Sequence, residues 1–293
     1  MTELQERQAE LGGVVFGDLT PVQLGPDGIQ VSDTEMRLGD RDTPGADGAQ
    51  FGIDYQDGRT VSMDLWTDTH TGQEARQALA ILRREWSADT ARSTSRAVVP
   101  LRFRMPDCDT VVVYGRPRRW TSGSQRTRDL GVVDVVADFR TADRLFYSDV
   151  ERSIQLSLVT SGGGGITWPI VWPVTWSPSG RSRQDAAVNW GDAPTWPVIT
   201  INGPVAQPEV EFLGTDRRVR LDMTIPHDRT ITIDTRPWAR TVLRDDGASF
   251  AGQLRGDMLA DLQLPVGQTT VAYRGTDLSG QSACTISWRT ATE

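Results

Sequence analysis

Length, composition and charge already exclude several classes of protein. The chain has 293 residues, enough for one large or two ordinary domains, and its formal net charge of −8 disfavours unspecific binding of nucleic acid. Lysine is absent, and the 28 glycines and 16 prolines are typical of a turn-rich β protein. No apolar run reaches membrane-spanning length, and the first residues lack the pattern of a secretory signal, so we expect no membrane segment and no export by that route.

Alternation of apolar and polar residues first appears in RTVSMDLWT, where Val61, Met63 and Leu65 occupy every second position. This period is that of a half-buried strand. The same pattern returns in SIQLSL, RRVRLDM and RTITIDT. Short strands at such intervals are typical of sandwiches and barrels, so the sequence predicts a mainly β fold.

One helix is predicted near residues 72–86. The stretch THTGQEARQALAILRREW opens with Thr71 and Glu74 at capping-box spacing and continues with apolar residues at helical intervals. The apolar stripe of this helix is expected to pack on the sheet of the first domain. We interpret Trp86 as a core residue.

Charge is unevenly distributed over the first half of the chain. Residues 1–89 contain 17 acidic residues and 7 arginines, whereas residues 92–128 contain 9 arginines and 2 aspartates. The stretch GRPRRWTSGSQRTRD surrounds a Ser-Gly turn, which predicts a hairpin loop. This loop would carry five arginines: Arg116, Arg118, Arg119, Arg126 and Arg128. They would pair with the domain's own carboxylates, meet an acidic face of a neighbouring subunit, or face DNA.

A domain boundary is predicted just before residue 150, because SIQLSL already has the pattern of a strand of the second domain. The first domain then spans residues 1–149 and the second spans residues 150–293. The run of four glycines that follows the boundary is interpreted either as a flexible joint or as a loop tip within the second domain.

The stretch SGGGGITWPIVWPVTWSP places three tryptophans four residues apart: Trp168, Trp172 and Trp176. Pro169 and Pro173 exclude a helix and favour an extended chain, in which the three rings project to one side. We interpret residues 161–180 as a long loop that packs partly on its own domain. A contact with another protein and a platform for sugar rings are the two alternatives.

No motif of an enzyme is found. His70 and His227 lack partners at metal-ligand spacing, and neither a nucleophile elbow nor a phosphate-binding glycine loop is present. Cys108 and Cys284 lie far apart and give no disulfide framework. We therefore expect no catalytic residue, no metal and no cofactor.

Three stretches of the chain resemble, in order, distal tail proteins of long-tailed bacteriophages. GVVDVVADFRTADRLFYSD is similar to the end of the ring-forming domain of that family, and APTWPVITINGPVAQPEVEF to the opening of its second domain. LQLPVGQTTVAYRGTDLSGQSACTISWRTA is similar to its last hairpin, although Gln268 stands where the family often has asparagine.

This resemblance implies a siphovirus-type minor tail protein, with an N-terminal β-sandwich ring domain bearing one α-helix and a C-terminal galectin-like (jelly-roll) β-sandwich. It implies a structural virion protein of the tail tip or baseplate, and no enzyme. The expected assembly is a homo-oligomeric ring, typically a hexamer, built in the host cytoplasm. Its expected partners are the tail tube protein, the tail-tip hub protein and other minor tail proteins, without specific nucleic-acid binding.

Galectin-like refers here to the fold. The sugar-binding pattern of galectins is missing, because Trp190 and Gly191 continue into Asp192 and Ala193 where that pattern has another residue and then glutamate. The alternative function is that of a carbohydrate-binding or receptor-binding β-sandwich protein of the tail tip.

Overall fold

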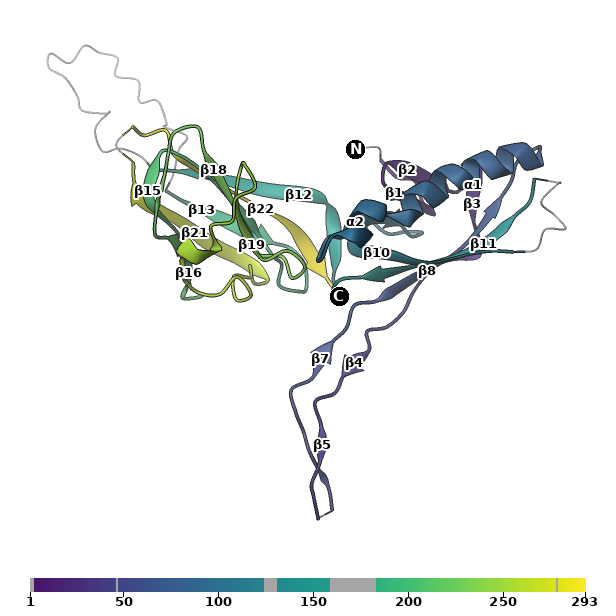
Figure 1. Ribbon diagram of the computed structural model, residues 1–293, viewed down its shortest axis with the longest axis horizontal. Coiled ribbons are helices and arrows are strands. Elements are labelled where there is room, and N and C mark those ends of the chain that lie inside the picture. The colour runs from purple at the N-terminus through teal and green to yellow at the C-terminus, as the bar shows by residue number, and fades with distance from the viewer. Residues whose placement is uncertain (1–2, 46, 124–130, 159–182, 278) are drawn as a thin grey trace, which may run out of the picture. The chain divides into compact units, whose positions relative to one another are not determined.

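The computed structural model describes residues 3–45, 47–123, 131–158, 183–277 and 279–293, and it is mainly β (Figure 1). The chain divides into two compact units. Unit 1 is Met1–Asp149 together with Thr292–Glu293, and unit 2 is Val150–Ala291. Within the described ranges, no helix is long and apolar enough to cross a membrane.

The division between the units falls inside strand β12 (Phe146–Ser157), so the chain passes from one unit into the next as a continuous strand. The four glycines at 162–165 come after this point in the sequence and lie outside the described residues. The chain returns to unit 1 at Thr292–Glu293, where the Glu293 carboxylate forms an ion pair with Arg144.

The body of unit 1 is built around strand β10, which pairs with three other strands. The strands of the body are β1 (Gln8–Leu11), β2 (Val14–Gly17), β3 (Val22–Val31), β8 (Thr60–Thr67), β9 (Val99–Arg104), β10 (Val111–Ser122), β11 (Asp134–Thr141) and the first residues of β12. The beginning of β10 pairs with β9 and β12, and its second half pairs with β11. A register shift between Pro117 and Arg119 interrupts the second ladder, as expected where proline lacks an N–H donor.

The core of unit 1 lies between these strands and a helix. Strands β8 and β11 bury every second side chain, and Val61, Met63 and Leu65 are wholly buried, which confirms the strand predicted there. Leu101 and Phe103 of β9 join the same core. Alternation in the sequence therefore identified the buried face of this sheet correctly.

Helix α1 (Gly72–Ser87) confirms the predicted helix and its start. The Thr71 hydroxyl accepts a hydrogen bond from the Glu74 N–H, and the Glu74 carboxylate accepts one from the His70 N–H. Trp86 is buried in the core, where its Nε1 donates to the Arg119 carbonyl at 3.0 Å. A short second helix, α2 (Asp89–Ser93), follows directly.

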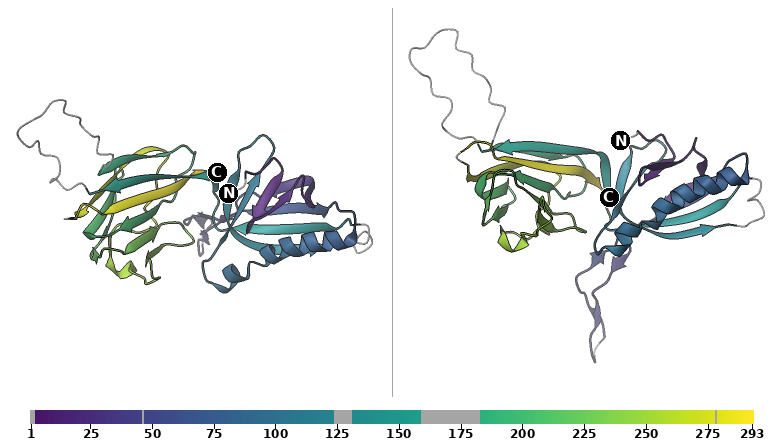
Figure 2. Two further views of the ribbon diagram at one scale, coloured as in Figure 1. Left: turned by 90° about the horizontal axis from the view of Figure 1, so that it is seen from above. Right: turned by 45° about the horizontal axis from the view of Figure 1, so that its top comes forward.

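Residues 32–59, between β3 and β8, leave the body of unit 1 as a long hairpin that we call the arm (Figure 2). The arm contains only very short strands: β4 (Met36–Arg37), β5 (Arg41–Asp42), β6 (Ala49–Gln50) and β7 (Tyr55–Gln56). β4 pairs with β7, and β5 pairs with β6, each as a separate two-stranded ladder. The sequence analysis did not predict this element.

Unit 2 is a β-sandwich. One of its sheets has the order β19–β18–β14–β22–β12, and the other has the order β13–β21–β15–β16–β20, with β17 also paired to β15. The strands that follow β12 are β13 (Gln184–Asn189), β14 (Val198–Asn202), β15 (Val205–Leu213), β16 (Arg217–Leu221), β17 (Thr224–Ile225), β18 (Thr230–Asp234), β19 (Thr241–Arg244), β20 (Leu254–Gly256), β21 (Gly267–Thr276) and β22 (Ala283–Thr292). A single 3-10 turn, η2 (Ala251–Gln253), precedes β20.

The core of unit 2 is apolar and contains side chains from both sheets. Cys284, Ile286 and Trp288 alternate along β22 and are all buried. The Trp288 Nε1 donates to the Val188 carbonyl at 3.1 Å, so the polar atom of this large ring has a partner. The finer description of unit 2 as galectin-like stays a prediction.

Candidate assembly surfaces

The described residues contain no group of three His, Cys, Asp or Glu side chains that could hold a metal ion. His70 precedes helix α1, and His227 is exposed beside Asp228, with 2.6 Å between Nδ1 and the carboxylate. Cys108 is an exposed thiol and Cys284 a buried one. The most prominent features of unit 1 are surfaces suited to contact with another protein.

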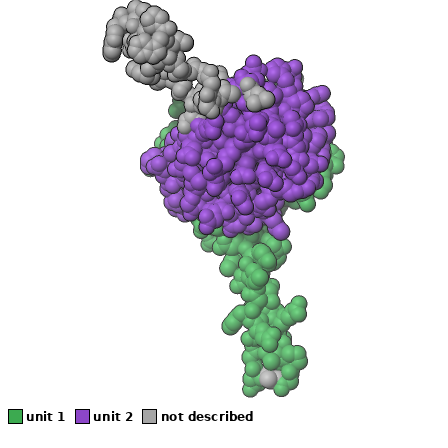
Figure 3. All heavy atoms as spheres, turned by 90° about the vertical axis from the view of Figure 1, so that its left-hand side faces the viewer, with its two compact units in different colours: residues 1–149, 292–293 green, residues 150–291 purple. Residues whose placement is uncertain are grey.

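The arm exposes most of its large apolar side chains. Figure 3 shows it as a narrow projection of unit 1, without a second layer over it. Phe51 is 88% exposed and Ile53 is 73% exposed. The complete set on the arm is Met36, Leu38, Phe51, Ile53 and Tyr55. Exposed apolar side chains concentrated in this way mark a surface that becomes buried on association.

The shape of the arm is set by contacts within it. The Asp40 carboxylate accepts from the Gly52 N–H at 3.1 Å, so the two sides of the hairpin are joined near its middle. A Cβ on Gly52 would lie 2.1 Å from the Gly39 carbonyl oxygen, which only glycine avoids. Near the base, Arg37 lies 3.4 Å from the Asp57 carboxylate. These contacts give the arm a defined form although no core supports it.

The sequence contains a pattern at this surface, but that pattern predicts a half-buried strand and not an exposed hairpin. Phe51, Ile53 and Tyr55 alternate with small or polar residues, which is the pattern of a half-buried strand. In the structure the alternating residues share a hairpin that no second sheet covers. The pattern therefore marks side chains that need burial, and a partner outside the chain would supply it.

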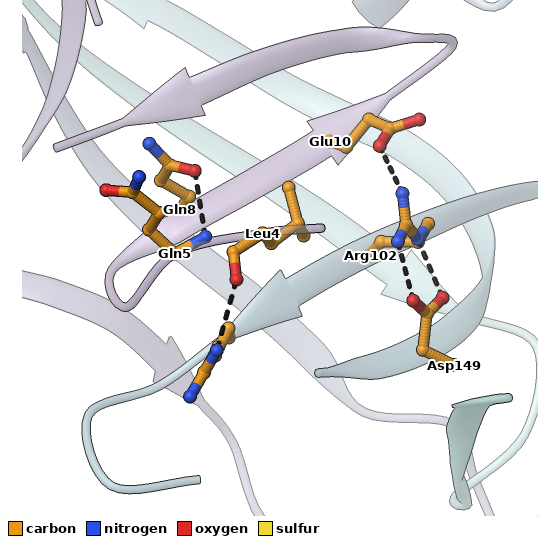
Figure 4. A network of polar contacts seen from close by, with 7 residues as sticks. Leu4, Gln5, Gln8, Glu10, Arg102 and Asp149 are labelled. Atoms are coloured by element: carbon orange, nitrogen blue, oxygen red, sulfur yellow. Dashed lines mark hydrogen bonds and ion pairs between the residues drawn. The ribbon is translucent and has the colours of Figure 1, made fainter. Parts of the chain in front are cut away.

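Arg102 holds three strands of unit 1 together (Figure 4). Its guanidinium donates two hydrogen bonds to the Asp149 carboxylate of β12, at 2.7 and 2.6 Å, and a third to the Glu10 carboxylate of β1. Its side chain is only 7% exposed. Hydrogen bonding to Asp149 is the main reason why the pKa of Arg102 is raised. This network fixes the start of β12.

The structure corrects the prediction that the arginines lie on a loop. Arg116, Arg118 and Arg119 belong to β10, because that strand continues to Ser122 before the hairpin turns. Arg116 is half-buried and donates to the Ala97 and Thr94 carbonyls, each at 2.7 Å, so it supports the chain between α2 and β9. The sequence-predicted Arg126 and Arg128 lie outside the described residues.

Of the three described arginines in this set, Arg118 and Arg119 are exposed to solvent. Arg119 lies 4.0 Å from the Asp138 carboxylate of β11, and Arg118 makes no ion pair within the described part of the chain. These two cations stand beside a bulge at the edge of the β10–β11 hairpin and are accessible to another molecule.

The three tryptophans singled out in the sequence, Trp168, Trp172 and Trp176, lie outside the described residues. Other tryptophans of unit 2 do reach its surface. Trp190 is exposed after β13, and two half-buried rings stack with arginines: Arg240 lies 5.7 Å from Trp196, and Arg236 lies 5.6 Å from Trp238. Tryptophan and arginine are enriched where proteins bind partners.

No protein-family model matches the sequence, and no curated protein matches it either. Solved structures do match the fold over both units. The Dit protein of phage SPP1, described as a paradigm of the hub adsorption apparatus in phages that infect Gram-positive bacteria, aligns with a TM-score of 0.58 at 15% identity, covering 97% of this chain and 98% of that one.

Two chains from the phage P2 baseplate in its activated conformation align as well. The structure with calcium gives a TM-score of 0.53 and the structure with strontium 0.52, each at 14% identity and covering 96% of this chain and 97% of the other. These likenesses show that the chain shares its fold with the SPP1 Dit protein and with the two baseplate chains over nearly its whole length.

Proposed function

We propose that this chain is a structural protein of a phage tail tip and not an enzyme. The observation that carries the proposal is the likeness to the SPP1 Dit protein, because it extends over both units and covers nearly all of each chain. The exposed apolar arm supports the same proposal, since a protein that acted as a monomer would gain nothing from leaving Phe51 and Ile53 in water.

The finer form of the proposal is a distal tail protein that assembles as a homo-oligomeric ring, for which we expect six subunits, between the tail tube and the tail-tip hub. The arm and the exposed pair Arg118 and Arg119 are the surfaces of unit 1 through which copies would meet. Two different surfaces on one subunit favour head-to-tail contacts, and these close into a ring when the rotation between neighbours allows it.

The mass of the purified protein in solution tests this proposal. Native mass spectrometry at increasing concentration should give one discrete oligomer larger than a dimer, and electron microscopy of the same sample should show annular particles with cyclic symmetry. A strict monomer at the highest attainable concentration, with or without tail tube and hub proteins added, would overturn it.

A carbohydrate-binding or receptor-binding function of unit 2 is the second candidate. The observation in its favour is the group of accessible tryptophans, Trp190 with the arginine-stacked Trp196 and Trp238, because aromatic faces also stack on sugar rings. The two candidates differ in their predictions for host cell-wall polysaccharide: a carbohydrate-binding protein binds it saturably, whereas a structural protein does not.

A further inference from the structure

Unit 1 carries an open apolar groove of about 800 Å³ beside helix α1. The groove runs between α1 and the turn from β2 to β3, and its lining includes Phe16, Ala78 and Leu82. Two large apolar side chains at its mouth are left in solvent, Leu19 at 83% and Ile81 at 49% exposure. A surface of this kind requires a partner that is itself apolar.

The exposed apolar surface of unit 1 is confined to few places. Among its described residues, the large apolar side chains left in solvent are the five of the arm, the two of the groove, and Val136 on β11. The arm presents protruding side chains and the groove presents a concave surface. Both surfaces are therefore apolar, and a protruding segment can enter a concave surface.

The arm and the groove lie at opposite ends of one strand pair. Val22 of β3 pairs with Thr67 of β8 at the groove end, and Val31 pairs with Val61 at the end from which the arm leaves. The eight residues of β8 separate these ends by about 25 Å. Figures 1 and 2 show the arm extending away from α1, so the arm of a subunit does not reach the groove of the same subunit.

We propose that the middle of the arm, which carries Phe51 and Ile53, occupies the α1 groove of a second copy of this chain. The proposal rests on the proposed function and deepens it by naming the two surfaces that meet. Because the donor and acceptor surfaces differ, the contact is head-to-tail and each subunit gives one arm and receives one.

Charge at the two surfaces agrees with this pairing. Arg41 lies opposite Gln50 in the β5–β6 ladder, and Gln50 directly precedes Phe51 in the chain. Arg41 has no ion pair among the described residues. The groove is bordered by Asp68 and Glu74. An arm seated in the groove would bring the Arg41 guanidinium to these carboxylates, which adds specificity to an apolar contact.

Cross-linking between two different cysteine variants tests the contact directly. Both variants carry Cys108→Ser, which removes the exposed native thiol. One carries Phe51→Cys and the other, bearing a tag, carries Ile81→Cys; the two full-length chains are co-expressed and treated with a short bis-maleimide. The matched control replaces Ile81→Cys with Val136→Cys, which is also at an exposed position but lies on β11.

The expected result is a covalent pair of one Phe51→Cys chain and one Ile81→Cys chain, with at least tenfold less product in the Val136→Cys control. Equal product in both, or a product joining two arms through Phe51→Cys, would overturn the proposal. An intact oligomer without cross-link to Ile81→Cys would also overturn it and would leave the proposed function standing, whereas a strict monomer would overturn the proposed function itself.

Substitutions provide a second measurement that does not depend on cross-linking geometry. Phe51→Asp and Ile81→Asp are both at exposed positions, so each should leave the circular dichroism and the unfolding midpoint unchanged. Each should weaken assembly by about tenfold or more, because one large apolar side chain no longer becomes buried. Val136→Asn, which adds no charge opposite Asp64 of β8, should leave assembly unchanged. Assembly of Ile81→Asp at the wild-type concentration would contradict the proposed acceptor site.

Discussion

At the scale of single residues, Arg102 is the centre of a buried ion network in unit 1. Its guanidinium is almost fully buried and joins Glu10 on β1 to Asp149 on β12, two strands that are far apart in the sequence. A buried ion network of this kind adds little over a well-packed apolar core, but removing one member leaves the others uncompensated. The loss of stability on substitution therefore depends on which charges of the network are left without a partner.

We expect Arg102→Met to lower the free energy of unfolding by about 3 kcal/mol, because the Glu10 and Asp149 carboxylates lose their cation. Urea denaturation followed by tryptophan fluorescence measures this loss. The triple variant Arg102→Met, Glu10→Leu and Asp149→Leu should recover part of it, since no charge is then left behind. If the triple variant is less stable than the single one, the network contributes through its geometry and not through its charges.

Asp143 predicts a dependence of stability on pH. Its Oδ2 accepts from the Tyr147 hydroxyl at 2.5 Å, whereas its Oδ1 is buried without a partner in the described structure. Burial raises the pKa of Asp143 to about 6 in the folded protein, well above its value in an unfolded chain. The carboxylate therefore destabilises the folded state above about pH 6, and this penalty disappears as the pH falls towards 4.

Asp143→Asn should remove this penalty. Relative to the wild type, the variant should gain about 2 kcal/mol at pH 7.5 and much less at pH 4.5, because the wild-type side chain is then neutral as well. The measurement is the unfolding free energy of both proteins at the two pH values. A difference that is the same at both would show that Asp143 does not titrate in this range.

At the scale of elements, β10 and the arm determine what unit 1 presents to another copy. β10 supplies Arg118 and Arg119 on its exposed edge while Arg116, two residues earlier, is engaged with the carbonyls of Thr94 and Ala97. A substitution of Arg116 would therefore disturb folding and assembly together. The two exposed arginines are the ones that test assembly alone.

The double variant Arg118→Glu and Arg119→Glu should fold like the wild type and assemble more weakly, because charge at the rim of an interface steers association. Raising the salt concentration should weaken wild-type assembly in the same direction, since exposed charges are screened. Arg220→Glu, at an exposed position of β16 in unit 2, is the matched control. Unchanged assembly of the double variant at low salt would remove these arginines from the interface.

Strand β8, helix α1, the arm and strand β10 show how far the sequence could predict this structure. The buried face of β8 and the start of α1 depend on short-range signals, namely alternation around Met63 and the Thr71–Glu74 cap, and both are confirmed. The exposure of Phe51 depends on the absence of a covering layer, which alternation does not encode. Likewise, the extension of β10 through Pro117 depends on its long pairing with β11, so Arg118 was expected on a loop.

At the scale of the whole molecule, the two candidate functions differ in what unit 2 binds. A tail-tip structural protein needs its partners to be proteins, whereas a receptor-binding protein needs a saturable site for host glycans. The likeness to the SPP1 Dit protein extends over both units and fixes the fold, but at 15% identity it leaves this choice to experiment.

Titration of the full-length protein with host cell-wall polysaccharide, followed by tryptophan fluorescence, should give no saturable change if the structural function is correct. Trp190 is exposed and would report binding near the end of β13. The variant Trp190→Phe is the control for quenching that does not depend on this ring. Saturable quenching in the wild type that is lost in the variant would favour carbohydrate binding.

The path of the chain has a consequence for how such a protein could vary. Thr292–Glu293 belong to unit 1 although all of unit 2 precedes them, and Glu293 pairs with Arg144 just ahead of β12. Unit 2 thus lies between two segments assigned to unit 1, and it begins within β12 and ends within β22. A domain with its own core can be exchanged for a different one, or enlarged in its loops, while the neighbouring domain keeps its fold and its contacts. Evolution could therefore change unit 2 independently of the exposed arm and groove of unit 1.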